Sequence, residues 1–123
     1  MRVLTLNVCG IRASQKKGLY KWLKKQKADY ICLQEVRANE EQISSNAFNL
    51  DGYIRYMSVA EKKGYSGVCI YTKKKPISIE TQFGSNFFYR EGRFISVNYK
   101  NISIVSVYFP SGSSSDERQK IKY

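Results

Sequence analysis

The chain has 123 residues, of which 42% are hydrophobic, and it carries a formal net charge of +11 with no histidine. This length suits one small domain, and the apolar content excludes general disorder. No apolar run approaches the roughly 20 residues that a membrane-spanning helix needs, and the amino terminus lacks the features of a signal peptide. We therefore expect a soluble, cytoplasmic protein that does not bind membranes.

The excess of positive charge is the strongest compositional signal. It favours a polyanionic partner, with nucleic acid as the leading candidate, although a lysine-rich solvated surface is an open alternative. The lysines cluster at residues 16–27, 62–63 and 73–75. Because histidine is absent, any catalysis has to use carboxylates, amides, phenols or lysines.

The three cysteines Cys9, Cys32 and Cys69 lie inside apolar runs and form no C-x-x-C pair. An odd number of thiols in buried-looking positions argues against a secreted disulfide framework. The spacing also argues against a zinc site.

The first part of the chain predicts a strand, a helix and a second strand. Residues 2–8 are rich in Val and Leu and indicate a strand buried on both faces. Residues 18–27 have helical periodicity, with lysines on one face. The predicted core face of this helix carries Leu19, Trp22 and Leu23. Residues 29–35 form the next apolar run, so we expect two parallel strands joined by a crossover helix.

The middle of the chain predicts a series of short strands. Asn39 and Gln42 have the spacing of a capping box and indicate a capped turn. The strand-like segments that follow are residues 53–59, 67–72, 77–83, 93–99 and 102–109. Their short links indicate antiparallel pairing, and the last two segments are typical of a hairpin.

The last residues predict the start of a helix. Ser114 and Glu117 form a second capping-box spacing, so a helix is expected to begin near Ser115. The sequence stops at Tyr123, which leaves this helix far shorter than the roughly 12 to 15 residues that are stable alone. We therefore expect residues 1–123 to be a fragment of a longer fold.

Three predicted strands are followed by, or end on, polar residues that could carry chemistry: Asn7, Glu35 and Tyr108. Loops at strand ends commonly hold functional groups. An unpaired carboxylate at the position of Glu35 would be costly, and Mg²⁺, which typically binds one or two carboxylates and a phosphate, would relieve that cost. The alternatives are a solvated or salt-bridged Glu35, a turn-forming Asn7 and a simple strand-end aromatic at Tyr108.

Five segments in order, "LNVCGIRA", "DYICLQEVR", "KKGYSGVCIYTK", "REGRFI" and "YFPSG", closely resemble the exonuclease III family of abasic-site DNA endonucleases. This family belongs to the endonuclease/exonuclease/phosphatase superfamily, and the resemblance extends to about Arg118. It implies an α/β fold, a four-layer α/β sandwich of the DNase I type. Residues 1–123 would supply its N-terminal half, as one mixed sheet with flanking helices, and the C-terminal half would be absent.

The resemblance also implies Mg²⁺-dependent hydrolysis of DNA phosphodiesters, with Mn²⁺ as an alternative ion. The implied reactions are incision at abasic sites, 3′-to-5′ exonuclease action and 3′-end cleaning on double-stranded DNA. Glu35 would be a metal ligand, Asn7 would lie beside it in the metal and phosphate network, and Tyr108 would point its phenol at the scissile phosphate. The residues implied to contact DNA or phosphate are Arg12, Arg37, Tyr65, Ser66, Arg93 and Ser111, and for Arg93 the resemblance implies a structural support as the alternative role.

The sequence departs from the family in two ways. Cys9 stands where the family usually has Asn or Asp, which removes a hard oxygen donor near the metal. The family's Gly-Asp-x-Asn and Ser-Asp-His segments, which activate water and add ligands, are missing. We therefore expect the chain to be inactive alone and to self-associate, through an uncovered apolar sheet face, or to pair with a C-terminal half. The alternative functions are a non-catalytic basic nucleic-acid-binding module and a superfamily phosphatase acting on phospholipid or inositol phosphate.

Overall fold

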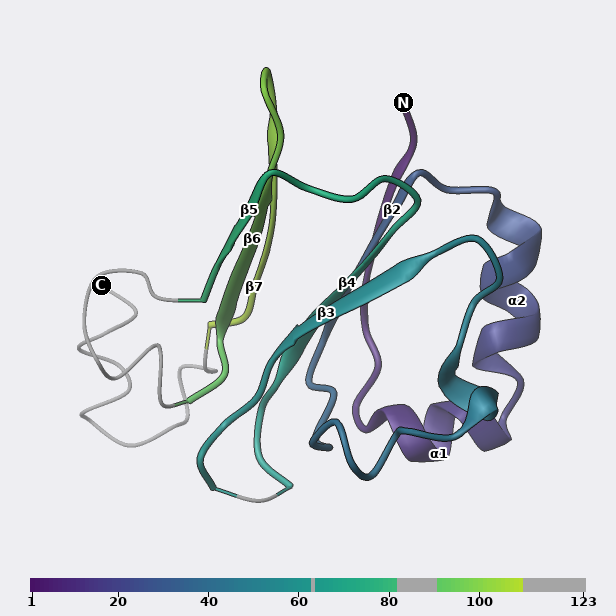
Figure 1. Cartoon of the computed structure of the whole chain (residues 1–123). Coiled ribbons are helices and arrows are strands. Elements are labelled where there is room, and N and C mark those ends of the chain that lie inside the picture. The colour runs from purple at the N-terminus through teal and green to yellow at the C-terminus, as the bar shows by residue number, and fades with distance from the viewer. Residues whose placement is uncertain (63, 82–90, 110–123) are drawn as a thin grey trace.

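A computed structural model describes residues 1–62, 64–81 and 91–109, and Figure 1 shows its elements. In chain order they are β1 (Val3–Asn7), α1 (Ile11–Lys16), α2 (Leu19–Gln26), β2 (Tyr30–Gln34), the 3₁₀ helix η1 (Asn46–Phe48), β3 (Ile54–Ser58), β4 (Val68–Thr72), β5 (Ser78–Glu80), β6 (Phe94–Asn98) and β7 (Ser103–Val107). Each predicted strand is present, so the α/β class is confirmed. The predicted helix near Ser115 lies outside the described residues.

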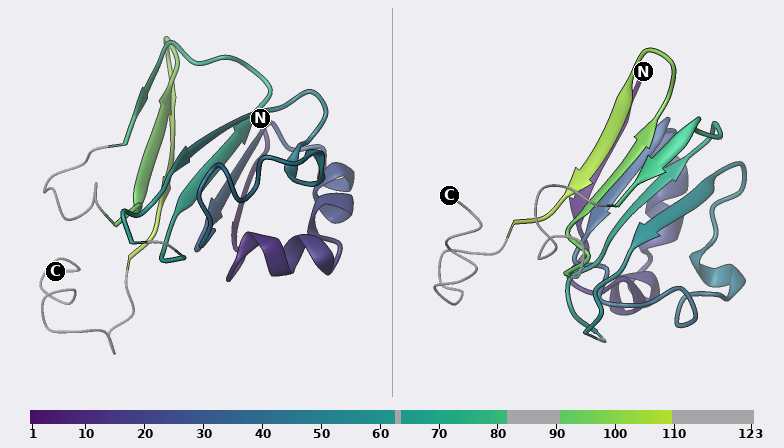
Figure 2. Two further views of the ribbon diagram at one scale, coloured as in Figure 1. Left: turned by 60° about the horizontal axis from the view of Figure 1, so that its bottom comes forward. Right: turned by 60° about the vertical axis from the view of Figure 1, so that its left-hand side comes forward.

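The described strands form two sheets that lie face to face. The first has the order β1-β2-β4-β3, and the second has the order β5-β6-β7. β1 and β2 are parallel, as predicted, and the other pairs are antiparallel. Helices α1 and α2 cover the face of the first sheet that is turned away from the second (Figures 1 and 2).

The alternation of side chains along β2 explains its continuous apolar sequence. Ile31 and Leu33 point to the helix side and pack in a cluster with Leu23 of α2. Cys32 points to the opposite side and lies in a cluster with Ile95 and other residues of the second sheet. A central strand buried on both faces needs apolar residues at its buried positions, and Ile31, Cys32 and Leu33 meet that requirement.

The division into two sheets differs from the single mixed sheet that we predicted. β4 lies between β2 and β3, so both of its edges are already hydrogen-bonded. Residues 73–77 therefore carry the chain from β4 into another sheet, where β5 pairs with β6. The prediction of an uncovered apolar sheet face is also wrong for the centre of the first sheet, because the second sheet buries Cys32, Val68 and Ile70 there.

The prediction that β1 is buried on both faces is wrong. Val3, Thr5 and Asn7 are exposed along one face of the strand. The strands of the second sheet approach β2, β3 and β4, and none has a comparable contact with β1. β1 is therefore an edge strand whose inner face is open in the described structure.

Helix α2 is the helix predicted from periodicity, but its buried face is rotated from the predicted one. Leu23 is fully buried, whereas Trp22 is 44% exposed and Tyr20 takes a core position in its place. The Tyr20 hydroxyl forms a 2.7 Å hydrogen bond with the Tyr71 hydroxyl, and its ring meets Phe48 edge-on. These partners draw Tyr20 inward and leave the indole of Trp22 in solvent.

Three smaller predictions have clear outcomes. Asn39 and Gln42 exchange side-chain-to-backbone hydrogen bonds, as a capping box does, and this confirms the capped turn. All three cysteines are free thiols; Cys32 and Cys69 are buried as expected, but Cys9 is exposed. Within the described residues, no helix combines the length and the apolar character that a membrane crossing requires.

Candidate active site

Three predicted site residues meet at one rim of the two sheets. Asn7 ends β1, Glu35 follows β2, and Tyr108 follows β7. Asn7 is opposite Gln34 in the parallel register, so Glu35 emerges beside it. The Tyr108 hydroxyl donates a 3.2 Å hydrogen bond to Glu35 Oε1. The amide, the acid and the phenol therefore come together from three strands in two sheets.

The Glu35 carboxylate has further partners. Arg37 Nη2 donates to Glu35 Oε1 at 3.1 Å. The Cys9 thiol lies 3.3 Å from Glu35 Oε2 and 3.3 Å from Asn7 Oδ1, and the Cys9 backbone N–H donates to the same amide oxygen at 3.0 Å. The side chain of Glu35 is only 15% exposed. It is thus a partly buried acid surrounded by donors.

The rim is built on an unusual backbone. Among the described residues, five non-glycine residues have positive φ, and four of them lie at the rim: Cys9, Glu35, Arg37 and Ser66. A left-handed conformation costs a side-chain-bearing residue about 1–2 kcal/mol. Clustered backbone strain of this kind is typical of functional sites, where surrounding contacts hold it in place.

Backbone hydrogen bonds tie the rim loops to one another. The loop after β2 bonds to the loop before β4, which bonds to the loop before β6, which in turn bonds to Tyr108. The bonds are Val36 N–H to Gly67 O, Arg37 N–H to Ser66 O, Gly67 N–H to Gly92 O and Tyr108 N–H to Arg93 O, at 2.7–3.0 Å. This series links both sheets and fixes Tyr108 relative to Glu35.

Arg93 supports the rim from inside. Its guanidinium lies 5.5 Å from the ring centre of Tyr65 and 5.3 Å from that of Tyr108. It donates to the Tyr65 hydroxyl at 2.7 Å and to Glu91 Oε1 at 3.2 Å. Because Arg93 is only 1% exposed, its side chain does not reach the surface. This geometry fits the predicted supporting role of Arg93 and does not fit the predicted contact with DNA or phosphate.

The other predicted contact residues divide between the surface and the interior. Arg12 and Arg37 are exposed at the rim, where Arg12 Nη2 donates to the Arg37 carbonyl at 3.1 Å. Tyr65 is half-buried. Ser66 is buried, with its hydroxyl 3.3 Å from the Gly92 carbonyl, so a DNA contact through that hydroxyl does not fit this structure. Ser111 lies outside the described residues.

The surroundings shift the pKa of the Glu35 acid and the pKa of the Tyr108 phenol in opposite directions. Burial favours protonated Glu35, but hydrogen bonds from Asn7, Cys9 and Arg37, together with the Arg37 charge, outweigh it and lower the pKa of this acid. Burial, followed by the charge of Glu35, raises the pKa of Tyr108. An ionised carboxylate therefore lies against a protonated phenol at neutral pH.

The donors at the rim fit a hard divalent cation. Carboxylate and amide oxygens are suitable ligands for Mg²⁺, which usually binds one or two protein carboxylates and keeps several waters. In the described part of the chain, no group of three or more His, Cys, Asp or Glu side chains gathers to hold a metal. The rim thus fits an ion that takes most of its ligands from water or substrate.

Sequence reasoning missed two supporting groups. Glu91 pairs with buried Arg93, and Gly92 leaves space that no other residue could leave, because a Cβ there would lie 2.5 Å from the Ala60 backbone nitrogen. Both belong to the "REGRFI" segment. The sequence signal that could have revealed them was a pair of opposite charges at the start of a strand-like segment. A charge that becomes buried there requires a partner.

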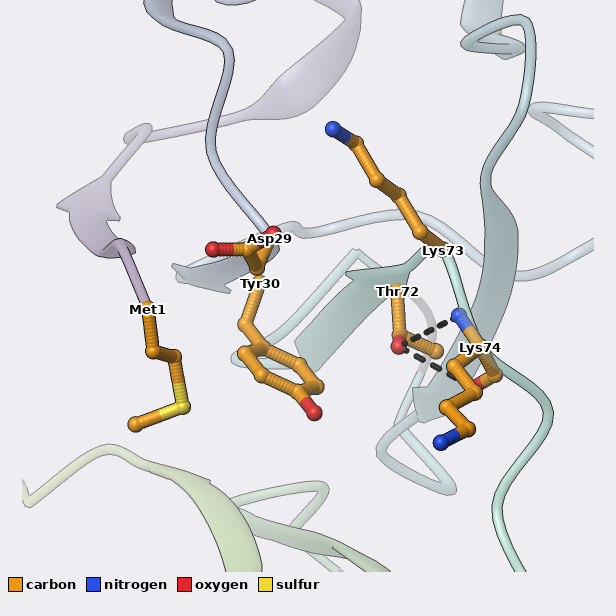
Figure 3. Close-up of a pocket in the computed structure, with 6 residues that line it drawn as sticks. All are labelled: Met1, Asp29, Tyr30, Thr72, Lys73 and Lys74. Atoms are coloured by element: carbon orange, nitrogen blue, oxygen red, sulfur yellow. Dashed lines mark hydrogen bonds between the residues drawn. The ribbon is translucent and has the colours of Figure 1, made fainter.

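A hollow lies at the end of the strands opposite the rim, and it is a poor candidate for the active site. Its volume is about 350 Å³, and Tyr30 and Thr72, at the other ends of β2 and β4, help to line it (Figure 3). The Thr72 hydroxyl bonds the backbone of Lys74, and Asp29 accepts the Arg2 N–H. The Thr72 hydroxyl and the Asp29 carboxylate are therefore already bonded within the protein.

The class of protein is defined by two facing sheets with Asn7, Glu35 and Tyr108 at one rim. The chain belongs to the Endonuclease/Exonuclease/phosphatase family, whose model matches residues 4–121. It is 33% identical over 119 residues to an exodeoxyribonuclease of Bacillus subtilis, covering 96% of this chain and 46% of that protein. It is 32% identical over 114 residues to a DNA-(apurinic or apyrimidinic site) endonuclease of Dictyostelium discoideum, covering 93% and 31%.

Solved structures of similar proteins also superpose on this chain. An AP endonuclease from Archaeoglobus fulgidus superposes with a TM-score of 0.81 at 28% identity, covering 99% of this chain and 46% of that one. The catalytic domain of Xenopus laevis APE2 superposes with a TM-score of 0.78 at 26% identity, covering 99% and 49%. The chain thus spans less than half the length of these relatives.

Proposed function

We propose that this chain contributes part of the active centre of a DNA repair nuclease of the exonuclease III type. The contact between Tyr108 and Glu35, with Asn7 beside them, is the observation that carries the proposal. The similar proteins are named as an exodeoxyribonuclease and as abasic-site endonucleases, which favours DNA over a phospholipid or inositol phosphate as the substrate. The net charge of +11 suits the same polyanion.

Glu35 and Asn7 would hold Mg²⁺, or Mn²⁺ in its place. When bound, the cation would stabilise the negative charge that develops on a phosphodiester during hydrolysis. Glu35 is ready for this role because its partners lower its pKa and keep it ionised. The amide of Asn7 adds a neutral ligand or donor without a second negative charge.

Tyr108 and the arginines of the rim would position the substrate. The raised pKa of Tyr108 keeps its hydroxyl protonated, so it can donate to a non-bridging phosphate oxygen. Exposed Arg12 and Arg37 can contact flanking phosphates, which orient DNA without reading its sequence. Specificity for an abasic site would come from the ease with which that nucleotide leaves the stack.

The remaining groups of the centre would come from a second polypeptide segment. The sequence contains no histidine that could activate water, and the relatives are more than twice as long as the matched region. β1 and β7 are edge strands of their sheets, and β7 lies over β2, so both edges fall on the same side. Val3 on β1 is 47% exposed. We propose that a carboxyl-terminal half, or a second copy, adds strands along these edges.

Two measurements test this function. Mn²⁺ binding is followed by paramagnetic broadening of backbone NMR signals, and it should affect Asn7, Glu35 and Tyr108 first. Glu35→Gln should abolish this local effect, whereas Glu40→Gln, which removes an exposed carboxylate elsewhere, should not. Broadening that is unchanged in Glu35→Gln would contradict the metal site.

The second measurement is cleavage of a duplex that contains one abasic site, in the presence of Mg²⁺. The chain alone should be inactive. Activity should appear after addition of the part of the Bacillus subtilis exodeoxyribonuclease that lies beyond the matched region, and it should be lost with Glu35→Gln. Duplex binding with no cleavage in either condition would instead favour a non-catalytic binding module.

A further inference from the structure

The helical layer carries a basic surface that is separate from the rim. Residues 13–28 contain six basic side chains and no acidic one. We call the part on α2 and its C-cap residue the α2 strip; it consists of Lys21, Trp22, Lys24, Lys25 and Lys27, all of which are exposed. Helix α2 lies on the outer face of the first sheet, away from the second sheet (Figures 1 and 2).

The charge of the α2 strip is not used within the described structure. The ion pairs found in residues 1–62, 64–81 and 91–109 join Arg37 to Glu35 and Arg93 to Glu91, and none involves a lysine of α2. Lys21 and Lys25 are four positions apart on the helix, where like charges repel and weaken it. A polyanion would remove this repulsion.

Trp22 adds an aromatic surface to this cluster of charge. Its side chain is 44% exposed, although the other large apolar residues of α2 pack inward: Leu23 and Tyr20 are buried, and Leu19 is partly buried against the same core. On the helix surface the indole lies one turn from Lys25. An exposed ring among lysines suits unpaired bases, because a base stacks on the ring while the cations hold its phosphates.

This arrangement favours a nucleic-acid strand over a membrane. A helix that inserts into a lipid interface needs a continuous apolar face, and α2 uses its apolar face to cover the first sheet. A duplex offers its bases only at the groove edges, whereas a single strand exposes their faces. We propose that the α2 strip binds single-stranded nucleic acid, with Trp22 stacking on a base and the lysines contacting phosphates.

Trp22 is the only tryptophan of the chain, so its fluorescence reports on this surface directly. Titration with a mixed-sequence, single-stranded oligodeoxynucleotide of about 12 nucleotides, within the usual range of site sizes, should quench the emission. The double variant Lys21→Gln/Lys25→Gln should weaken binding about tenfold, and the logarithm of affinity should fall less steeply with the logarithm of salt concentration.

The matched control is Lys73→Gln/Lys75→Gln, which removes the same charge from the exposed link after β4 and should change affinity less than about twofold. Trp22→Ala, followed by anisotropy of a labelled oligonucleotide, should also weaken binding. Glu35→Gln should leave the quenching intact, which separates this surface from the proposed nuclease centre.

Three results would overturn the proposal. The first is equal weakening by both double variants, which would mean that net charge alone binds the strand. The second is oligonucleotide binding without any change in Trp22 emission. The third is a larger spectral change with anionic phospholipid vesicles than with the oligonucleotide, which would assign the strip to a membrane surface.

Discussion

The Tyr108 hydroxyl donates to Glu35 Oε1 across 3.2 Å, although 73 positions separate the two residues in the chain. The phenol is supported by Arg93 beneath its ring, and the carboxylate is held by Arg37. Each partner is thus fixed from its own sheet. The contact is a property of how the two sheets face each other and makes the rim a sensitive reporter of their packing.

The first prediction concerns the dependence of stability on pH in the metal-free protein. The partners of Glu35 lower its pKa in the folded state, so the ionised carboxylate stabilises the fold above its ordinary pKa of 4.5. This stabilisation is lost as the pH falls through the lower, folded-state pKa. Glu35→Gln should reduce the free energy of unfolding by about 1 kcal/mol near neutral pH. The deficit should shrink below pH 4.5.

Urea titrations between neutral pH and the acid range measure this difference, with chelator present and with Glu40→Gln as the matched control. A deficit that stays constant across the titration would show that Glu35 acts through packing and not through its charge.

The second prediction concerns the phenol. Burial raises the pKa of Tyr108, and the negative charge of Glu35 raises it further. Glu35→Gln should therefore shift the titration of Tyr108 downward, toward its ordinary value of 10. The measurement is the ring carbon chemical shift in tyrosine-labelled protein, with the Tyr108 signal assigned by its loss in Tyr108→Phe. An unchanged titration would place the two groups farther apart in solution.

The third prediction concerns Cys9. Its hydrogen bond to Glu35 is the largest cause of a raised pKa, and this keeps the thiol protonated and slow to react. Glu35→Gln should speed alkylation of Cys9 by iodoacetamide about two- to fivefold at mildly alkaline pH. Peptide mass spectrometry reads out the site, and buried Cys32 and Cys69 serve as internal controls. Equal rates in both proteins would contradict the contact.

The fourth prediction concerns Gly92, which has φ +61°. A Cβ here would lie 2.5 Å from the Ala60 nitrogen and 2.6 Å from the Val59 carbonyl carbon. Gly92→Ala should therefore lower the free energy of unfolding by about 3 kcal/mol or more. Gly52→Ala is the matched control, since Gly52 also has positive φ but open space around it, and it should cost only about 1 kcal/mol. Similar losses in thermal or urea unfolding would exclude the steric explanation.

The strands were predictable because their signals are local. Alternating and continuous apolar runs marked each strand, and the order of strand, helix and strand gave the parallel pair β1 and β2. The second sheet was not predictable in the same way. Strand periodicity does not say that β4 already has partners on both edges, and that fact sends β5 elsewhere.

The candidate site was partly predictable for the same reason. Asn7, Glu35 and Tyr108 stood out as polar residues at strand ends, and the structure brings them together. The burial of Arg93 and the exposure of Trp22 were not visible, because each depends on tyrosines from distant elements. Long-range packing decides which member of an amphipathic pattern faces inward.

The distance in sequence between Glu35 and Tyr108 has a consequence for biosynthesis. At 5 to 20 residues per second, a ribosome needs roughly 4 to 15 seconds to add the 73 residues that follow Glu35 up to and including Tyr108. During that interval a nascent polypeptide already carries its acid but not its phenol. Assembly of the rim therefore waits until Tyr108 has been synthesised, and slowing elongation between these codons would prolong the time during which Glu35 is incompletely shielded.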